Sequence, residues 1–119
     1  MPVSNLNLYF SRGDSRTVPA LAQDYQQNII NLTGATVTCD ARRDPRDTTP
    51  VFTKTIANGG ITVTNAAAGL FTINILPADT AELADYSQSL YYDCKVTTSG
   101  GATTTVLGGK IYLSANISY

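Results

Sequence analysis

Short runs in which threonine alternates with apolar residues are the feature that most restricts how this chain can fold. Residues 36–39 (TVTC) and 61–64 (ITVT) are examples. Successive side chains of a β-strand point to opposite faces, so these runs place apolar side chains on one face and hydroxyls on the other. Helical periodicity is nearly absent. The pattern therefore predicts half-buried antiparallel strands.

The strands predicted from this alternation are separated by residues that favour turns. They cover residues 6–10, 16–21, 35–42, 51–57, 61–64, 70–76, 89–97, 103–107 and 110–117. Residues 58–60 (NGG) and 99–101 (SGG) accept positive φ, and we expect each to close a hairpin between consecutive strands. A slightly longer connection is expected at residues 65–69 (NAAAG).

A proline and a pair of glycines indicate where strands depart from regular pairing. Pro19 has no N–H group, so the strand over residues 16–21 is expected at a sheet edge. Gly108 and Gly109 interrupt the last apolar run. They predict a bulge, or a bend where that strand changes partner.

One short helical turn is predicted over residues 77–83 (PADTAEL). Asp79 stands three residues before Glu82, the spacing of a capping box with Asp79 in the N-cap position. We expect this turn to cross from one sheet to the other, with Leu83 closing the end of the core. Short strands with close turns indicate a β-sandwich.

The length indicates one domain. The chain has 119 residues, which is too short for two ordinary cores. We expect a single domain over residues 1–119, in which residues 1–4 and about 22–30 form an arm or a loop.

The composition limits the partners that the chain can bind. Charged residues make up only 14%, and 8 basic against 9 acidic residues give a net charge of −1. This argues against electrostatic binding to nucleic acid or to an anionic membrane. No run approaches the roughly 18 apolar residues of a spanning helix, and the first residues lack the pattern of a secretory signal. We therefore expect no nucleic-acid or membrane partner, and synthesis in a cytoplasm.

The sequence shows little equipment for catalysis or metal binding. It contains no histidine, the usual general base and a common zinc ligand. The loop of residues 40–47 interleaves arginines with aspartates, which is a poor arrangement for calcium. We expect no catalytic, cofactor-binding or metal-binding residue, no cofactor, and no enzymatic activity.

Cys39 and Cys94 both fall on apolar faces of predicted strands, so they could face one another across the core. Tyr92 stands two places before Cys94, and this spacing resembles the core cysteines and corner tyrosine of immunoglobulin domains. Buried thiols are favoured in a cytoplasmic product, with a disulfide as the alternative.

Tyrosine is more frequent than phenylalanine, by 7 to 3. Tyr91, Tyr112 and Tyr119 have outward parity or a terminal position. Exposed tyrosine serves protein interfaces and sugar stacking alike. We favour an interface, because the tyrosines are spread along the sequence without the tryptophan and clustered acids that usually accompany sugar binding.

The order of several short motifs resembles a known family. The motifs are residues 12–15 (RGDS), 31–38 (NLTGATVT), 42–45 (RRDP), 67–73 (AAGLFTI), 77–83 (PADTAEL), 92–96 (YDCKV) and 107–111 (LGGKI). In this succession the chain is similar, over roughly residues 5–117, to the immunoglobulin-like domain of tailed-bacteriophage structural proteins. The N-terminal domain of the baseplate upper protein family is the nearest match.

The resemblance implies an all-β, immunoglobulin-like antiparallel β-sandwich with one short helical turn. It also implies a non-enzymatic structural virion protein: a tail, baseplate or fibre-attachment component. Such a protein would dock in multiple copies, or as a homo-oligomer, on other phage structural proteins in a symmetric assembly, and would reach the virion after assembly in the bacterial host cytoplasm. Capsid decoration and host-carbohydrate binding are the alternatives. Edge strands near residues 6–21 or 110–117 could add to a partner's sheet.

Overall fold

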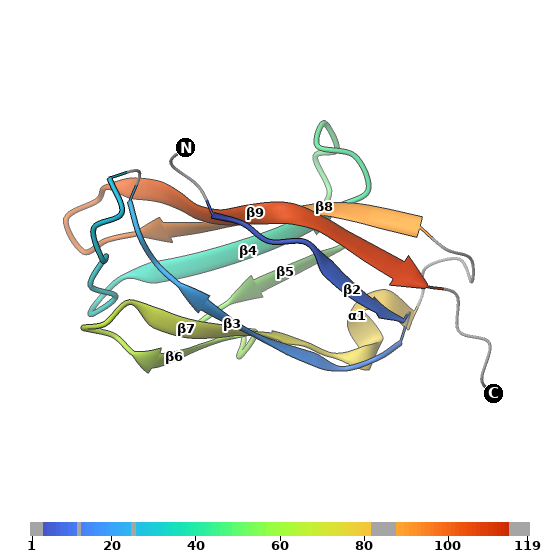
Figure 1. The fold of residues 1–119 in the computed structure, drawn as a ribbon, viewed down its shortest axis with the longest axis horizontal. Helices are drawn as coiled ribbons and strands as arrows, with labels where there is room; N and C mark the ends of the chain where they lie inside the picture. Colours follow the sequence, from blue (N-terminus) through green and yellow to red (C-terminus); the bar gives the residue numbers. More distant parts are fainter. Residues whose placement is uncertain (1–3, 12, 25, 82–87, 115–119) are drawn as a thin grey trace.

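The alternating runs fold into two β-sheets that pack face to face (Figure 1). The computed structural model describes residues 4–11, 13–24, 26–81 and 88–114. The elements are β1 (Ser4–Asn5), β2 (Leu8–Ser11), β3 (Arg16–Leu21), β4 (Thr36–Arg42), β5 (Phe52–Thr55), β6 (Ile61–Asn65), β7 (Leu70–Ile75), α1 (Pro77–Ala81), β8 (Gln88–Thr97) and β9 (Thr103–Ser114). In β4 the buried residues are Val37, Cys39 and Ala41, and those between them are partly exposed, as the alternation predicts.

The strand order is that of an immunoglobulin-like sandwich. The larger sheet has the order β1–β9–β8–β4–β5, with β2 also paired to β9, and the smaller sheet has the order β3–β7–β6. In immunoglobulin domains strands B, E and D share one sheet, and strands G, F, C and C′ share the other. Assigning B to β3 and continuing along the chain to G at β9 reproduces both orders. The all-β immunoglobulin-like fold is thus confirmed, although β1 and β2 pair with β9 in parallel.

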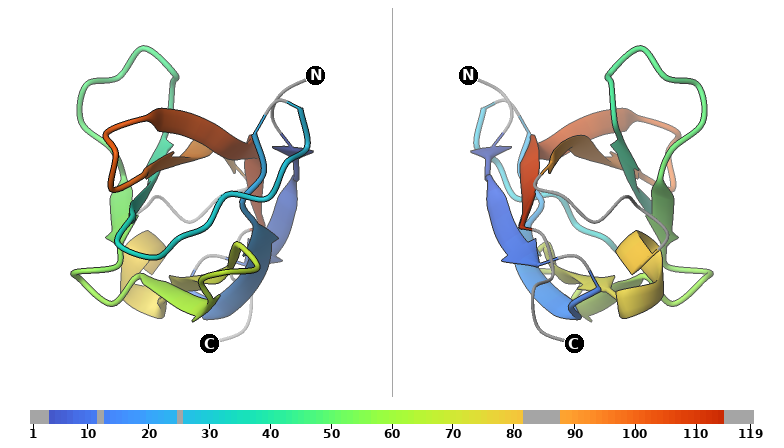
Figure 2. Two further views of the ribbon diagram at one scale, coloured as in Figure 1. Left: turned by 90° about the vertical axis from the view of Figure 1, so that its left-hand side faces the viewer. Right: turned by 90° about the vertical axis from the view of Figure 1, so that its right-hand side faces the viewer.

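The inner faces of the two sheets supply one core. Phe71, Ile73 and Ile75 come from β7 in the smaller sheet, and Leu90 and Ile111 come from the larger sheet; each is at most 2% exposed. Burying a side chain of this size contributes about 1.5–3 kcal/mol. The end-on views of Figure 2 show the sheets facing each other, with the loop of residues 43–51 projecting beyond them.

Two of the predicted connections are confirmed. Residues 99–101 lie in a hairpin that joins β8 to β9, and residues 66–69 join β6 to β7. Gly101 and Gly69 have φ values of 93° and 70°. Side chains rarely adopt such values, so glycine is needed at both turns.

The predicted hairpin at residues 58–60 is wrong. The segment carries the chain from β5 in the larger sheet to β6 in the smaller one. The physical reason is that the side-chain amide of Asn58 occupies the free edge of β5, where β6 would otherwise pair. Asn58 Oδ1 accepts from Thr55 N (2.9 Å), and Asn58 Nδ2 donates to Thr53 O (3.0 Å).

The helical turn forms and leads from β7 to β8, so it connects the two sheets as predicted. The predicted role of Asp79 is wrong, because α1 already begins at Pro77, a position that suits proline. Asp79 is therefore inside the first turn, and its Oδ2 accepts from Leu76 N (2.6 Å), just before the helix. Glu82 and Leu83 lie outside the described residues. In the described part of the chain, no helix is long and apolar enough to span a membrane.

β9 contains a bulge, but it precedes the predicted glycine pair. The register with β8 shifts between Thr105 and Leu107. The predicted change of partner is observed at the glycine pair, because β9 pairs with β1 at Leu107 and Gly108 and with β2 from Ile111 onward. A Cβ atom at Gly109 would collide with the carbonyl oxygen of Leu6. The glycine lets the N-terminal segment pass close to β9 between β1 and β2.

Residues 22–24 and 26–30 follow an irregular path between β3 and β4, within the range expected as an arm or loop. Gln23 and Ile29 form an isolated bridge across this path. Ala22 is fully buried, and its N–H donates to Gly69 O (2.8 Å). The start of this segment is therefore packed against the sandwich.

Candidate functional site

The free edges of the sandwich are mostly blocked. Asn58 takes two backbone groups of β5, as described above. On β2, Arg16 Nη1 donates to Tyr9 O (3.2 Å), and Ser11 O accepts from Asp14 N (3.1 Å). Pro19 lies in β3, which is an edge strand as predicted, and it removes an N–H group there. Such devices oppose strand addition by another chain.

One predicted docking edge is not an edge. β9 pairs with β8 on one side and with β1 and β2 on the other. Residues 110–114 are therefore interior, because the N-terminal strands cover them. The expectation that residues 110–117 add to a partner's sheet is wrong for this part, and residues 115–117 lie outside the described ranges.

Cys39 and Cys94 are buried free thiols, but they do not face one another across the core. They are direct partners on β4 and β8, side by side in the larger sheet. The expectation failed because β4 and β8 correspond to strands C and F, which are neighbours. In antibody domains the disulfide instead joins strands B and F of opposite sheets.

The two thiols form a closed contact rather than a reactive site. Ala41 O accepts from Val51 N (2.6 Å), so alternate residues of β4, Cys39 included, direct their backbone groups toward β5. Cys39 and Cys94 are then a non-hydrogen-bonded pair with respect to β8, for which Cα atoms lie about 4.5 Å apart. A hydrogen bond with the Cys39 thiol, together with burial, raises the pKa of Cys94. This suppresses the thiolate that a nucleophile requires.

Tyr92 ties the N-terminal segment to the larger sheet. Its hydroxyl donates to Leu6 O (2.5 Å), and its side chain is buried among the core residues. Burial raises the pKa of Tyr92 above its ordinary value. The residue therefore acts as a neutral donor that fixes the N-terminal segment, whereas the corner tyrosine of immunoglobulin domains bonds to backbone a few residues upstream.

The charged loop after β4 contains contacts between its own arginines and aspartates. Arg46 Nη2 lies 3.2 Å from Asp44 Oδ2, and hydrogen bonds from the side chain and backbone of Arg46 lower the pKa of Asp44. Arg42 Nε donates to Asp47 O (3.0 Å). The arginines therefore take up the Asp44 carboxylate and the backbone oxygen of Asp47, which a cation would otherwise bind. Within the described ranges, no group of three or more His, Cys, Asp or Glu residues could hold a metal ion.

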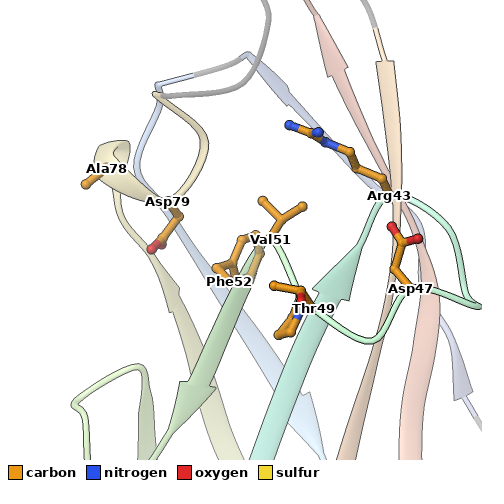
Figure 3. Close-up of a pocket in the computed structure, with 8 residues that line it drawn as sticks. Arg43, Asp47, Thr49, Val51, Phe52, Ala78 and Asp79 are labelled. Carbon is orange, nitrogen blue, oxygen red and sulfur yellow. The ribbon is translucent and has the colours of Figure 1, made fainter.

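A cleft of about 500 Å³ opens between this loop and α1 (Figure 3). Val51 and Phe52 lie between Arg43 on the loop side and Asp79 on α1. Asp79 Oδ2 is already bound by Lys54 Nζ (2.5 Å), whose side chain is only 6% exposed. This leaves Asp79 committed to the structure and unsuited to acid–base chemistry with Asp47.

Three tyrosines gather on the outer face of the larger sheet. The rings of Tyr9 and Tyr112 stack with centroids 4.9 Å apart and planes inclined by 11°, and Lys110 Nζ lies 5.2 Å from the Tyr91 ring centroid. The sequence predicts outward positions for Tyr91 and Tyr112, but the place of Tyr9 beside them is a finding of the structure. Tyr9 lies between the buried residues Leu8 and Phe10, so strand alternation directs its side chain outward. Only the pairing of β2 with β9 brings it next to Tyr112.

Two acidic residues lie on the same face. Asp40 and Asp93 are direct partners on β4 and β8. Arg42 Nη2 lies 3.4 Å from Asp40 Oδ2. The outer face of the larger sheet is therefore a mixed surface of aromatic and charged groups.

The outer face of the smaller sheet differs in having no charged side chain among the outward-facing residues of its three strands. These residues are Thr17, Pro19, Leu21, Thr62, Leu70, Thr72, Asn74 and, at the irregular end of β6, Thr64 and Asn65. Arg16 has inward parity, opposite Ile75, and its guanidinium turns to β2. We call this surface the neutral face.

No protein-family model matches the chain, and no curated protein matches it. Function must therefore be argued from the fold and its surfaces.

Proposed function

We propose that the chain is a non-enzymatic structural component of a tailed-phage virion, namely a tail, baseplate or fibre-attachment part. It docks on a symmetric assembly through the neutral face. The observation that carries the proposal is the lack of charge on the outward side of β3, β7 and β6. The resemblance to phage immunoglobulin-like domains supports the proposal that this assembly is a phage virion.

The physical argument is one of desolvation. Removing a charged group from water is expensive unless a partner compensates it, whereas threonine methyl groups and leucine side chains lose little. Leu70 is 41% exposed on this face, and Leu76 is 55% exposed just beyond β7. They supply apolar contact area of the kind found at interface centres.

The blocked edges favour docking through a face. Strand addition would require unpaired backbone groups, and Asn58, Arg16 and Pro19 reduce their number on three of the edge strands. Contact through side chains avoids this obstacle. Many copies on one ring or shell would make weak individual contacts effectively permanent.

Incorporation into particles tests the proposal. Thr17→Asp places a charge on the neutral face, and Thr36→Asp is the matched control, an equally exposed strand threonine on the other sheet. Mass spectrometry of purified phage particles should find the wild-type chain and Thr36→Asp at a copy number set by the particle symmetry. Thr17→Asp should be strongly depleted while remaining folded. A chain absent from particles, or equal incorporation of both variants, would overturn the proposal.

Capsid decoration would use the same face on a different part of the particle. Separating heads from tails before mass spectrometry distinguishes the two locations. We expect the chain in the tail fraction, and its recovery with heads would assign it to decoration.

A further inference from the structure

A second hollow lies at one end of the outer face of the larger sheet. Its volume is about 500 Å³, and it spans β2, β9 and β8. The lining residues are Tyr9, Phe10, Ser11, Gln88, Ser89, Tyr112, Leu113 and Ser114. All eight are uncharged, in contrast to the next cross-strand row, which contains Lys110 and Arg42.

The register explains how these residues meet. Tyr9 on β2 pairs with Tyr112 on β9, which pairs with Ser89 on β8. Ser11 pairs with Ser114 in the same parallel ladder. The two tyrosine rings therefore form one edge of the hollow, and the serine hydroxyls lie beside them.

The tyrosine rings and the serine hydroxyls of the hollow are available to a ligand. Tyr9 is 64% exposed and Tyr112 is 37% exposed, so part of the stacked pair faces solvent. The hydroxyls of Ser11, Ser89 and Ser114 form no hydrogen bond with any other described residue. Aromatic carbon beside free donors and acceptors suits a molecule that has an apolar face and several hydroxyls.

We propose that this hollow binds one neutral pyranose unit of a polysaccharide. The C–H face of the sugar packs on the more exposed ring, that of Tyr9, which Tyr112 supports by stacking, and its hydroxyls exchange hydrogen bonds with the three serines. A carboxylated or phosphorylated sugar would call for arginine or lysine, and the lining residues that the structure describes include neither. The volume falls within the range of small-molecule sites.

This inference goes beyond the docking role and does not rest on it. The hollow and the neutral face lie on opposite outer surfaces of the sandwich. A copy docked through the neutral face would hold the hollow away from the assembly. Repeated copies would then bind a repetitive polysaccharide more tightly than one site could.

Nuclear magnetic resonance titration tests the site on the full chain. The probes are the methyl glycosides of glucose, galactose and N-acetylglucosamine. We expect saturable shifts of the Ser89, Tyr112 and Ser114 amides with at least one of them. Tyr9→Ala should weaken binding about tenfold, the equivalent of about 1.4 kcal/mol, whereas Tyr9→Phe should retain it because the ring remains.

Tyr91→Ala is the matched control, since Tyr91 lies on the same face but does not line the hollow. It should bind as the wild type does, and Tyr9→Ala should keep a dispersed spectrum because Tyr9 is largely exposed. Absence of saturable shifts with all three glycosides, or equal binding by Tyr9→Ala, would overturn the inference. Stronger binding of a glucuronic-acid glycoside would do the same.

Discussion

Replacing Lys54 with methionine should destabilise the protein by about 3 kcal/mol. Lys54 Nζ lies 2.5 Å from Asp79 Oδ2, and the two side chains are 6% and 15% exposed. Removing one partner of a buried ion pair typically costs 3–5 kcal/mol, because the other charge stays buried without compensation. Asp79 keeps some exposure and its bond to Leu76 N, so the lower end applies. Methionine is also an unbranched side chain, so it preserves most of the contact that the carbon atoms of Lys54 make beside Gly60.

A double-mutant cycle separates the ion pair from its surroundings. Asp79→Asn alone leaves the Lys54 charge buried and weakens the contact that begins α1, which is worth about 1 kcal/mol. The double variant contains no orphaned charge. Its loss of stability should therefore be smaller than the sum of the single losses, with a coupling energy of about 2 kcal/mol.

Urea denaturation followed by circular dichroism measures these free energies of unfolding. Lys95→Met is the matched control, because Lys95 is exposed on the outer face of the larger sheet; it should change stability by less than about 0.5 kcal/mol. If Lys54→Met behaved like Lys95→Met, or if the two single losses simply added, then the contact between β5 and α1 would not be the buried ion pair described here.

Three further predictions concern the larger sheet. A maleimide should modify both Cys39 and Cys94 in unfolded, unreduced protein and neither in native protein, and protection after unfolding would reveal a disulfide. Because burial raises the pKa of Tyr92 above 10.0, its stabilising effect should be complete below about pH 10 and decline as the pH rises further. Tyr92→Phe should flatten that decline and cost about 1 kcal/mol at neutral pH, and an unchanged alkaline slope in urea titrations would contradict this. Gly109→Ala should lower the free energy of unfolding by about 1–3 kcal/mol through its collision with Leu6, and unchanged stability would mean that the N-terminal segment is not held there.

Local periodicity in the sequence predicts most of the strands. The strand predicted over residues 35–42 is observed as β4 (Thr36–Arg42), and that over 89–97 is observed as β8 (Gln88–Thr97). Alternation and glycine turns depend on neighbours in sequence, so they can be recognised without coordinates. The edge position of Pro19 follows from the chemistry of a single residue in the same way.

Contacts between distant segments could not be predicted in this way. Local sequence predicts a hairpin at Asn58, because turn residues there follow a strand. The contact of the Asn58 side chain with the edge of β5 depends on three-dimensional geometry, which local sequence does not show. The misplacement of Cys39 and Cys94 has a similar origin, since parity assigns a face but not the neighbouring strand. The stacking of Tyr9 on Tyr112 requires the parallel register of β2 with β9, which joins opposite ends of the chain.

The neutral face shows both what alternation predicts and what it cannot predict. The outward parity of Thr17, Thr62 and Thr72 is readable from alternation. Their common surface is not, because it requires β3, β7 and β6 to form one sheet. A composition with only 14% charged residues favours such a surface but does not locate it.

A cryo-electron microscopy reconstruction of the assembled phage particle, at a resolution that separates strands, tests the central claim most directly. It should place copies of this sandwich around a symmetry axis, with β3, β7 and β6 packed against a neighbouring protein and the tyrosine-bearing sheet turned to solvent. A particle without the chain, or copies whose neutral face is open to solvent, would contradict the account.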